Sequence, residues 1–353
     1  MSTKPHRLTA LLLACALLSS GASAGILAVT GAFARDGSPT TTVVQASSST
    51  GGLRAGALYA AASPGVVDIT AEGSSSGGKA TGTGFVVDRR GHIVTASHVV
   101  DGASKVTVRF AGGATRTATV TGKDDATDVA VLKIDPSGLT LHPLKLASSS
   151  SLAVGAAVAA IGDPFGYARS ISTGIVSGVD RTIQAPNGFT VAHAIQTDAP
   201  LNPGNSGGPI LDSSGRVIGI ADQIATNGSS QQSSGVGFAV PIDLVSGELG
   251  ALESGKTIHH AYLGVSSSDS TTATGALVGA VAPGSPAAAA GVRTGDVITA
   301  VDGRPITGSG GLVAAVAGHS PGQQVALTVR RRSGTQTLNV ALGTQPKSTG
   351  SAG

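Results

Sequence analysis

The sequence predicts a mainly β protein of two domains with flanking segments. Its 353 residues exceed the length of one ordinary domain. Because it has 52 glycines, no tryptophan and only 3% aromatic residues, its cores must be built mainly from Val, Ala, Ile and Leu. Short apolar runs recur along the chain, each ended by Gly, Asp or Ser, without alternating helical patterns. This spacing favours β-barrels or a sandwich over an alternating α/β fold.

Residues 1–35 are predicted to form a signal peptide or a membrane anchor. Lys4, His6 and Arg7 precede an uncharged run, residues 8–34, which exceeds the roughly 20 residues that cross a bilayer. If residues 8–18 are the apolar region of a signal peptide, Ala-Ser-Ala at 22–24 is a cleavage site and the protein is secreted. If the whole run stays embedded, it is a single anchor with its basic end inside. Both outcomes place the remaining chain outside the cytoplasm.

Charge and cysteine content exclude several kinds of partner and site. The net charge is only +3 and the basic residues are scattered, which argues against a nucleic-acid partner. The densest basic cluster, residues 330–332, precedes a turn and is interpreted as a solvated strand end. Cys15 is the only cysteine and lies in the leader, so the folded body has no disulfide and no thiolate metal site. Lipid modification of Cys15 is disfavoured because Leu13 is bulky for that motif.

Residues 36–56 are rich in Ser, Thr, Gly and Pro and are predicted to be a flexible linker. Ordered structure is expected from about Ala57. Two sets of short strands and one helix follow. The first set is 66–70, 84–88, 92–95, 105–110, 115–121 and 129–134; the second is 156–162, 170–178, 190–197, 209–211, 217–222 and 235–240; the helix is 241–252.

Ser206 lies in the run TDAPLNPGNSGGPI, residues 197–210. Glycines on both sides let the backbone bend around Ser206, which exposes its hydroxyl and aims nearby N–H groups at the group that the oxygen attacks. A serine displayed in this way is a candidate acyl-transfer nucleophile. It requires a base and a group that orients the base, because a free serine is a weak nucleophile at neutral pH.

His98 is the candidate base and Asp128 the candidate orienting group. His98 lies in TASHVV, at the bend after a predicted strand, where a loop can present it to a cleft. Asp128 directly precedes an apolar strand, where it can be buried against an imidazole N–H. The chain order His98, Asp128, Ser206 is one of three known for such a triad and is associated with paired β-barrels. The site is therefore expected in the cleft between the two strand sets.

The other histidines and aspartates fit these roles less well. His92 opens its strand beside a glycine and is expected to be exposed. Asp124 and Asp125 are interpreted as turn residues, and Asp198 as structural support behind the serine loop. No histidine has three converging metal ligands at a usable sequence spacing, so no metal is expected.

Several separate stretches occur in the order of one known family. They are GTGFVVD (82–88), TASHVV (95–100), DVAVLKI (128–134), GDPFG (162–166), STGIVSG (172–178), IQTDAPLNPGNSGGPI (195–210) and GVGFAVP (235–241). With these stretches the chain resembles the HtrA/Deg family of trypsin-like serine proteases. The resemblance implies two six-stranded antiparallel β-barrels of the trypsin-like type over 57–247 and a small α+β PDZ domain over 258–345. Residues 346–353 are expected to form a disordered tail.

The resemblance also implies roles for single residues. The N–H groups of Gly204 and Ser206 would form an oxyanion hole, and Leu201 and the loop after Ile220 would line the specificity pocket. No acid lies at the base position of that pocket, so small or medium aliphatic residues are expected to be preferred over basic ones. No cofactor is implied. A homotrimer is implied, assembled through the N-terminal edge of the protease domain with Tyr59 as a contact.

Tyr262, Leu263, Gly264 and Val265 resemble the loop whose backbone N–H groups bind a peptide carboxylate in PDZ domains. A peptide bound there would add a strand, with main-chain hydrogen bonds giving affinity and a side-chain pocket giving preference. The order of such domains is also followed by the stretches 275–281, 285–290, 295–298 and 324–330.

The resulting hypothesis is an extracytoplasmic serine endopeptidase that cleaves unfolded or damaged proteins through an acyl-enzyme. Its PDZ domain would capture exposed chain ends or regulate the site. Two alternatives stay open. One is a catalytically quiet chaperone or PDZ scaffold, against which the complete triad argues. The other is a narrow processing protease that cuts one membrane-bound signalling protein, and the sequence does not separate this from general quality control.

Overall fold

The computed structural model describes residues 53–73, 78–163, 169–224 and 235–346. The predicted leader (1–35), most of the predicted linker (36–56), part of the GDPFG stretch and the tail beyond residue 346 lie outside these residues. No helix within the described ranges is long and apolar enough to cross a bilayer.

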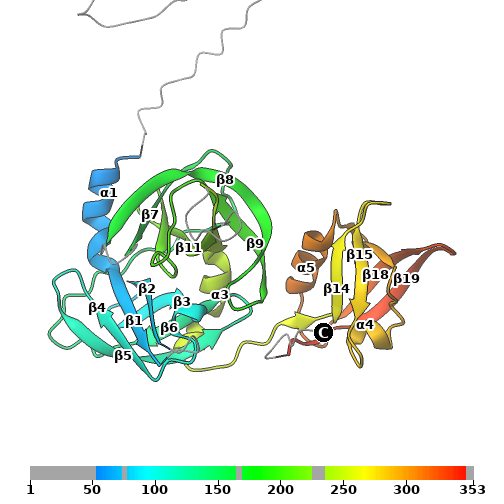
Figure 1. The fold of residues 1–353 in the computed structure, drawn as a ribbon, viewed down its shortest axis with the longest axis horizontal. Coiled ribbons are helices and arrows are strands. Elements are labelled where there is room, and N and C mark those ends of the chain that lie inside the picture. The colour runs from blue at the N-terminus through cyan, green and yellow to red at the C-terminus, as the bar shows by residue number, and fades with distance from the viewer. Residues whose placement is uncertain (1–52, 74–77, 164–168, 225–234, 347–353) are drawn as a thin grey trace, which may run out of the picture. The chain divides into compact units, whose positions relative to one another are not determined.

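The first barrel closes six antiparallel strands in the order β1-β2-β3-β6-β5-β4 (Figure 1, blue to cyan). β1 pairs with both β2 and β4, so the sheet has no free edge. A helix and a 3-10 turn precede β1, and a short helix follows β3. The elements are α1 (Ala55–Ala62), η1 (Ser63–Gly65), β1 (Val66–Glu72), β2 (Lys79–Val86), β3 (His92–Ala96), α2 (Ser97–Val100), β4 (Lys105–Arg109), β5 (Thr115–Asp124) and β6 (Val129–Lys133).

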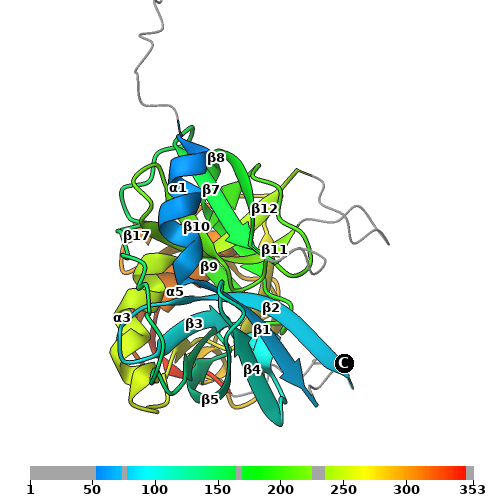
Figure 2. The ribbon, with the colours of Figure 1, turned by 90° about the vertical axis from the view of Figure 1, so that its left-hand side faces the viewer.

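The second barrel closes in the order β10-β11-β12-β9-β8-β7, with β7 paired to β10. β8 runs on to Gln184, beyond the end expected at Gly178, because its pairing with β9 resumes after shifts in register. Helix α1 lies beside β8 (Figures 1 and 2). The strands are β7 (Ala157–Gly162), β8 (Ser170–Gln184), β9 (Thr190–Thr197), β10 (Pro209–Asp212), β11 (Val217–Ile224) and β12 (Gly237–Pro241).

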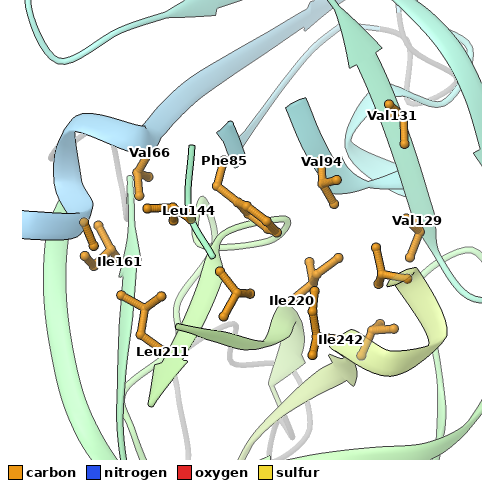
Figure 3. Packing of buried hydrophobic residues seen from close by; sticks show 14 of the residues in the cluster. Val66, Phe85, Val94, Val129, Val131, Leu144, Ile161, Leu211, Ile220 and Ile242 are labelled. Atoms are coloured by element: carbon orange, nitrogen blue, oxygen red, sulfur yellow. The ribbon is translucent and has the colours of Figure 1, made fainter. Parts of the chain in front are cut away.

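Buried apolar side chains from both barrels form one continuous cluster (Figure 3). Phe85 of β2 is fully buried in it, with Val94 of the first barrel and Ile220 of the second close by. Helix α3 (Ile242–Glu253) follows β12, packs against β5, β6 and β11, and adds Ile242 to the cluster. Because each such side chain contributes roughly 1.5–3 kcal/mol on burial, this layer holds the two barrels together.

The C-terminal domain has its own apolar core and a sheet in the order β14-β15-β16-β18-β19, with β17 paired to β16. Ser285 caps α4 by accepting from the N–H of Ala288, and a proline opens the helix. Arg331 of the basic cluster binds the buried Asp296, Nε to Oδ1 2.6 Å. The elements are β13 (Ala261–Tyr262), β14 (Val265–Asp269), β15 (Ala276–Val281), α4 (Pro286–Ala289), β16 (Val297–Val301), β17 (Arg304–Pro305), α5 (Ser309–Ala317), β18 (Gln324–Arg331), β19 (Gly334–Ala341) and β20 (Gly343–Thr344).

The predicted fold class is confirmed: the protein is mainly β, with two six-stranded antiparallel barrels and a smaller α+β domain. Every strand expected over residues 66–240 overlaps an observed one, because glycines and polar turn residues separate apolar runs of strand length. The barrels are closed by pairings between strands that are distant in sequence, such as β1 with β4.

Truncation of Phe85 tests the layer between the barrels. We expect Phe85→Ala to lower the free energy of unfolding by about 3–5 kcal/mol, since a fully buried ring leaves a cavity. Val154→Ala is the control, because Val154 is 62% exposed, and a change within about 0.5 kcal/mol is expected. Denaturant unfolding followed by circular dichroism measures both. Equal effects of the two substitutions would contradict the central place of Phe85.

Candidate active site

The pairing of β3 with β6 brings His98 and Asp128 together. In the antiparallel register Ala96, the last residue of β3, faces Val129, the first of β6. The chain leaving β3 therefore lies beside the chain entering β6, and the N–H of Ser97 donates to the carbonyl of Asp128 at 3.0 Å. His98 Nδ1 lies 2.5 Å from Asp128 Oδ2. This hydrogen bond places a proton on Nδ1 and leaves Nε2 free to accept one.

Asp128 is fully buried, and several donors hold its carboxylate. Oδ1 accepts from the N–H of His98 at 2.9 Å and from the hydroxyl of Ser97 at 2.8 Å. Asn187, in the turn between β8 and β9, reaches across from the second barrel and lies 3.3 Å from the same oxygen. The backbone of Asp128 has a φ of 55°, a left-handed conformation that persists because these bonds fix both neighbouring segments. The carboxylate is therefore fixed in one orientation.

The loop that carries Ser206, between β9 and β10, packs on the strand that leads to His98. Gly207 has a φ of 84°, which favours glycine. A Cβ on Gly207 would collide with the hydroxyl of Thr95 and the backbone N–H of Ala96, at the end of β3. This close approach brings the serine loop of the second barrel against the histidine segment of the first.

Thr83 of β2 ties the serine loop to the first barrel. It is fully buried, and its N–H donates to the carbonyl of Ser206 at 2.9 Å. Its hydroxyl donates to the carbonyl of Gly204 at 2.7 Å and accepts from the N–H of Asp163 at 3.0 Å. One buried threonine thus fixes the backbone on both sides of Asn205.

Two N–H groups beside the serine are unused. Those of Gly204 and Ser206 donate to no acceptor among the described residues, whereas the N–H of Asn205 between them donates to Asn202 at 2.9 Å. The hydroxyl of Ser206 donates to the carbonyl of Asp222 at 3.0 Å. Within the part of the chain that the structure describes, no hydrogen bond joins this hydroxyl to the imidazole of His98.

Asp222 of β11 brings a second carboxyl group to the pair. Its side chain is 3% exposed. One of its oxygens, a ring nitrogen of His98 and a carboxylate oxygen of Asp128 all lie within 4.8 Å of one another. Burial and, after it, the charge of Asp128 raise the pKa of Asp222 well above its usual value.

Leu201, predicted to line a specificity pocket, is buried in the core of the second barrel. It is 2% exposed, and its Cδ1 would lie 2.7 Å from a Cβ on Gly237. The segment after Ile220, expected as another wall, continues as β11, and residues 225–234 beyond it lie outside the described residues.

The predicted carboxylate-binding loop joins β13 to β14 in the C-terminal domain. Gly264 has a φ of 84°, and a Cβ there would collide with the side chain of Ser285. The carbonyl of Gly264 accepts from the N–H of Ala282 at 2.9 Å, and that of Leu263 accepts from Ala287 at 2.9 Å. These bonds fix the loop at the start of β14, which is the edge strand of the sheet.

His92 is buried, so the expectation that it is exposed is wrong. It is 7% exposed, and its Nδ1 lies 2.7 Å from Asp88 Oδ2. Arg90 binds Asp88 and reaches Glu253 at the end of α3, at 2.9 Å, which covers the start of β3. The sequence could not indicate this cover, because α3 is far along the chain.

Tertiary contacts bring together possible metal-ligand groups that the sequence spacing did not suggest. Three sets of side chains in the described residues bring possible ligand atoms within 4.8 Å of one another. In each set a histidine already binds a carboxylate of the same set: His98 binds Asp128, His92 binds Asp88 and His260 binds Asp124. The sets are His98, Asp128, Asp222; Asp88, His92, Glu253; and Asp124, Glu248, His260.

Comparison with known proteins agrees with this architecture. The chain matches the trypsin-like peptidase domain family over residues 82–220 and the PDZ domain family over residues 261–342. A solved structure, the HtrA-type protease AlgW with tripeptide, is 30% identical, with a TM-score of 0.70 over 83% of this chain and 98% of that one. The chain belongs to the HtrA/Deg family of trypsin-like serine proteases.

Curated members of the HtrA/Deg family match most of the chain. Serine protease PepD of Mycobacterium tuberculosis is 40% identical over 282 residues, which cover 74% of this chain. A protein of Halomonas elongata named "Probable periplasmic serine endoprotease DegP-like" is 38% identical over 293 residues, which cover 80% of this chain. The chain spans 60% of the length of each of these two relatives.

Sequence reasoning missed three residues that contact the site in this HtrA/Deg chain. Asn187 stands in an ordinary turn sequence, Ala-Pro-Asn-Gly, and nothing local connects it with Asp128. Thr83 is one of several threonines and glycines in β2. Asp222 did carry a signal, since it is a charged residue inside an apolar strand, and such a residue is rarely buried without a partner.

Alanine at Gly207 tests the packing of the serine loop on β3. We expect Gly207→Ala to destabilise the protein more than Gly215→Ala by about 1–3 kcal/mol. Gly215 is the matched control, because its φ is 76° but a Cβ there meets nothing within 4 Å. Both substitutions carry the backbone strain, so the difference reports the contacts with Thr83, Thr95 and Ala96. Denaturant unfolding measures it, and equal losses would argue against the contact.

Proposed function

We propose that this chain is a serine endopeptidase in which Ser206 is the nucleophile, His98 the general base and Asp128 the group that orients the imidazole. One observation carries the proposal. His98 Nδ1 lies 2.5 Å from Asp128 Oδ2, at the end of the strand on which the serine loop packs. This arrangement supports acyl transfer, because Nε2 is left free to take the serine proton.

The reaction follows from these roles. His98 accepts the hydroxyl proton as Ser206 attacks the scissile carbonyl, and it returns that proton to the leaving amine. A water molecule then hydrolyses the acyl-enzyme by the same relay. The hydrogen bond from Ser206 to the carbonyl of Asp222 must break first. A rotation about the Cα–Cβ bond of Ser206 achieves this while Thr83 holds the backbone.

The N–H groups of Gly204 and Ser206 are proposed as the oxyanion hole. Among the described residues these N–H groups have no acceptor, which supports this role, since they can donate to the oxygen of a tetrahedral intermediate. Loss of one such donor typically costs about 2.7–4 kcal/mol of transition-state stabilisation. The bond from the Thr83 hydroxyl to the Gly204 carbonyl fixes the orientation of this segment.

Unfolded or damaged proteins are the proposed substrates, cleaved after small or medium aliphatic residues. A site composed of loops from two barrels suits an extended chain better than a folded surface. Leu201 is proposed to form the apolar floor of the specificity pocket, and its burial supports a structural contribution to that floor. The absence of an acid at the pocket base, implied by the family resemblance, disfavours basic residues.

The PDZ domain is proposed to bind peptides through β14. This strand lies at the edge of its sheet, and Ser309 at the start of α5 bonds to Ser267 of β14 at 2.8 Å. A peptide can therefore add to β14 beside α5, with its carboxylate at the N–H groups of residues 262–265. Leu263 and Leu312 are both buried in the core of the domain and give the site an apolar base.

We also propose that the folded body works outside the cytoplasm as a homotrimer. The uncharged run at residues 8–34 supports export, by cleavage or by anchoring. One relative has the word periplasmic in its name. Tyr59 of α1 is partly buried at the N-terminal edge of the protease domain, where the family resemblance implies trimer contacts.

Removal of the Ser206 hydroxyl tests the enzyme directly. We expect a fluorophosphonate probe to label the wild type and not Ser206→Ala, because only an activated serine attacks phosphorus. An unfolded protein should be degraded by the wild type alone, and its folded form should be cut far more slowly. Gel electrophoresis of labelled and digested samples measures both.

Ser172→Ala is the control for this experiment, because Ser172 is a surface serine that donates to the carbonyl of Pro200. It should be labelled like the wild type. If the wild type is not labelled, even with added peptide ligands, the alternative of a catalytically quiet chaperone or scaffold is favoured. Labelling together with the loss of one natural cleavage product in cells would favour the narrow processing protease.

The carboxylate-binding loop is tested by binding of short fluorescent peptides that end in an aliphatic residue. We expect Gly264→Ala to weaken binding about 10-fold or more, because the added Cβ displaces N–H groups that bind a charged group. Gly284→Ala is the matched control, since its φ is 71° and a Cβ there meets nothing within 4 Å. Fluorescence anisotropy gives the dissociation constants. Equal binding of amidated and free peptides would oppose carboxylate recognition.

A further inference from the structure

We propose that Asp222 is a positioning residue of the site, whose carboxyl group keeps its proton at neutral pH and donates it to the carboxylate of Asp128. The assignment extends the proposed serine protease mechanism and rests on it. It adds a fourth group to the relay, one that the order His98, Asp128, Ser206 does not contain.

The fold directs Asp222 into the site by a β-bulge. In the pairing of β11 with β12, Ala221 faces Ala239 and Gln223 faces Phe238, so Asp222 is the extra residue between them. Bulges of this kind re-aim a side chain and are common beside active sites. Without the bulge, the direction of the Asp222 side chain would be set by the regular alternation of side chains between the two faces of the sheet along β11.

Asp222 contacts both ends of the relay. Its backbone carbonyl accepts from the hydroxyl of Ser206 at 3.0 Å. Its carboxyl group lies within 4.8 Å of His98 and Asp128. The next residue back, Ala221, accepts from the N–H of Gly207 at 2.7 Å, which ties the bulge to the serine loop. A change in the protonation state of Asp222 therefore affects both Asp128, the orienting group, and Ser206, the nucleophile.

No N–H or hydroxyl donor among the described residues reaches either carboxyl oxygen of Asp222, although the side chain is 3% exposed. An ionised carboxylate needs donors when it is buried, because water no longer solvates it. The carboxylate of Asp128 lies close to that of Asp222, within 4.8 Å, and is itself an acceptor. Two carboxyl groups in contact form a favourable pair when one holds a proton and donates it. The raised pKa of Asp222 agrees with this.

The proton is assigned to Asp222, and not to Asp128, because the two carboxyl groups differ in the hydrogen-bond donors that surround them. Asp128 accepts from the N–H and ring of His98, from Ser97 and from Asn187. On Oδ2 the structure shows one donor, the His98 ring, so this oxygen can accept a second. Asp222 has none of these donors. The titratable groups that approach Asp222 in the described residues are Asp128 and His98.

The neutral carboxyl group has two effects on the relay. It adds a hydrogen bond that fixes Asp128, and it keeps the site at one negative charge. An ionised Asp222 would place a second negative charge near His98 and favour the imidazolium form, which cannot take the proton of Ser206. The effect is expected in kcat more than in KM, because Asp222 acts through Asp128.

Carbon-13 NMR of protein labelled at the aspartate carboxyl carbons tests the protonation state directly. In the full chain at neutral pH, we expect one protonated carboxyl signal that disappears in Asp222→Asn. Asp68 is a second buried aspartate with a raised pKa, so the substitution is needed for the assignment. If the signal lost in Asp222→Asn is that of an ionised carboxylate, the proposal is overturned.

The activity of two variants tests whether the side chain of Asp222 donates a hydrogen bond to Asp128. Asp222→Asn keeps an N–H donor and cannot ionise, so kcat should stay within about threefold of the wild type. Asp222→Leu has a similar shape and no donor, and kcat should fall about 10- to 100-fold with KM little changed. Equal losses in both variants, with both folded by near-UV circular dichroism, would overturn the donor role.

The two readouts separate this proposal from the proposed function. If the wild type is labelled by the fluorophosphonate probe but Asp222 is ionised, only the assignment of Asp222 fails. If the wild type is never labelled, the serine protease assignment fails, while the NMR signal still reports the proton on Asp222.

Discussion

A layer of buried apolar side chains, contributed by both barrels and by α3, is the constraint on which the arrangement of this protein depends. Phe85 and Val94 enter it from the first barrel and Ile220 from the second. Val94 is on β3, which leads to His98, and Ile220 is on β11, which leads to Asp222. Close packing of this layer leaves little freedom for the strands that carry the site. This packing therefore fixes the positions of the strands that lead to His98 and carry Asp222.

Backbone hydrogen bonds complete the placement. The register of β3 on β6 sets His98 beside Asp128, and the bonds from Thr83 hold the chain on both sides of Asn205. Gly207 allows the serine loop to approach β3 more closely than any side chain would permit. The geometry of the site is thus fixed by main-chain bonds together with the hydroxyl of Thr83.

The electrostatics of the site are set by an unequal distribution of donors. Asp128 is buried but accepts four hydrogen bonds, two of them from His98. Asp222 is almost as deeply buried and has no such donor among the described residues. In a medium of low polarity, this difference decides which of two adjacent carboxyl groups carries the charge. With the proton that we propose on Asp222, both carboxyl groups can remain buried while the pair carries one negative charge.

The sequence by itself determined the strands and their order, because apolar runs ended by glycine, aspartate or serine are a local pattern. It also indicated His98, Asp128 and Ser206, each of which stands in a recognisable stretch next to a strand. Only the tertiary structure decided that Asn187, Thr83 and Asp222 contact these residues, and that α3 buries His92. Such contacts depend on barrel closure, strand register and a bulge, which are fixed by pairing between distant segments. Of these residues only Asp222 left a local trace, as a charged residue inside an apolar strand.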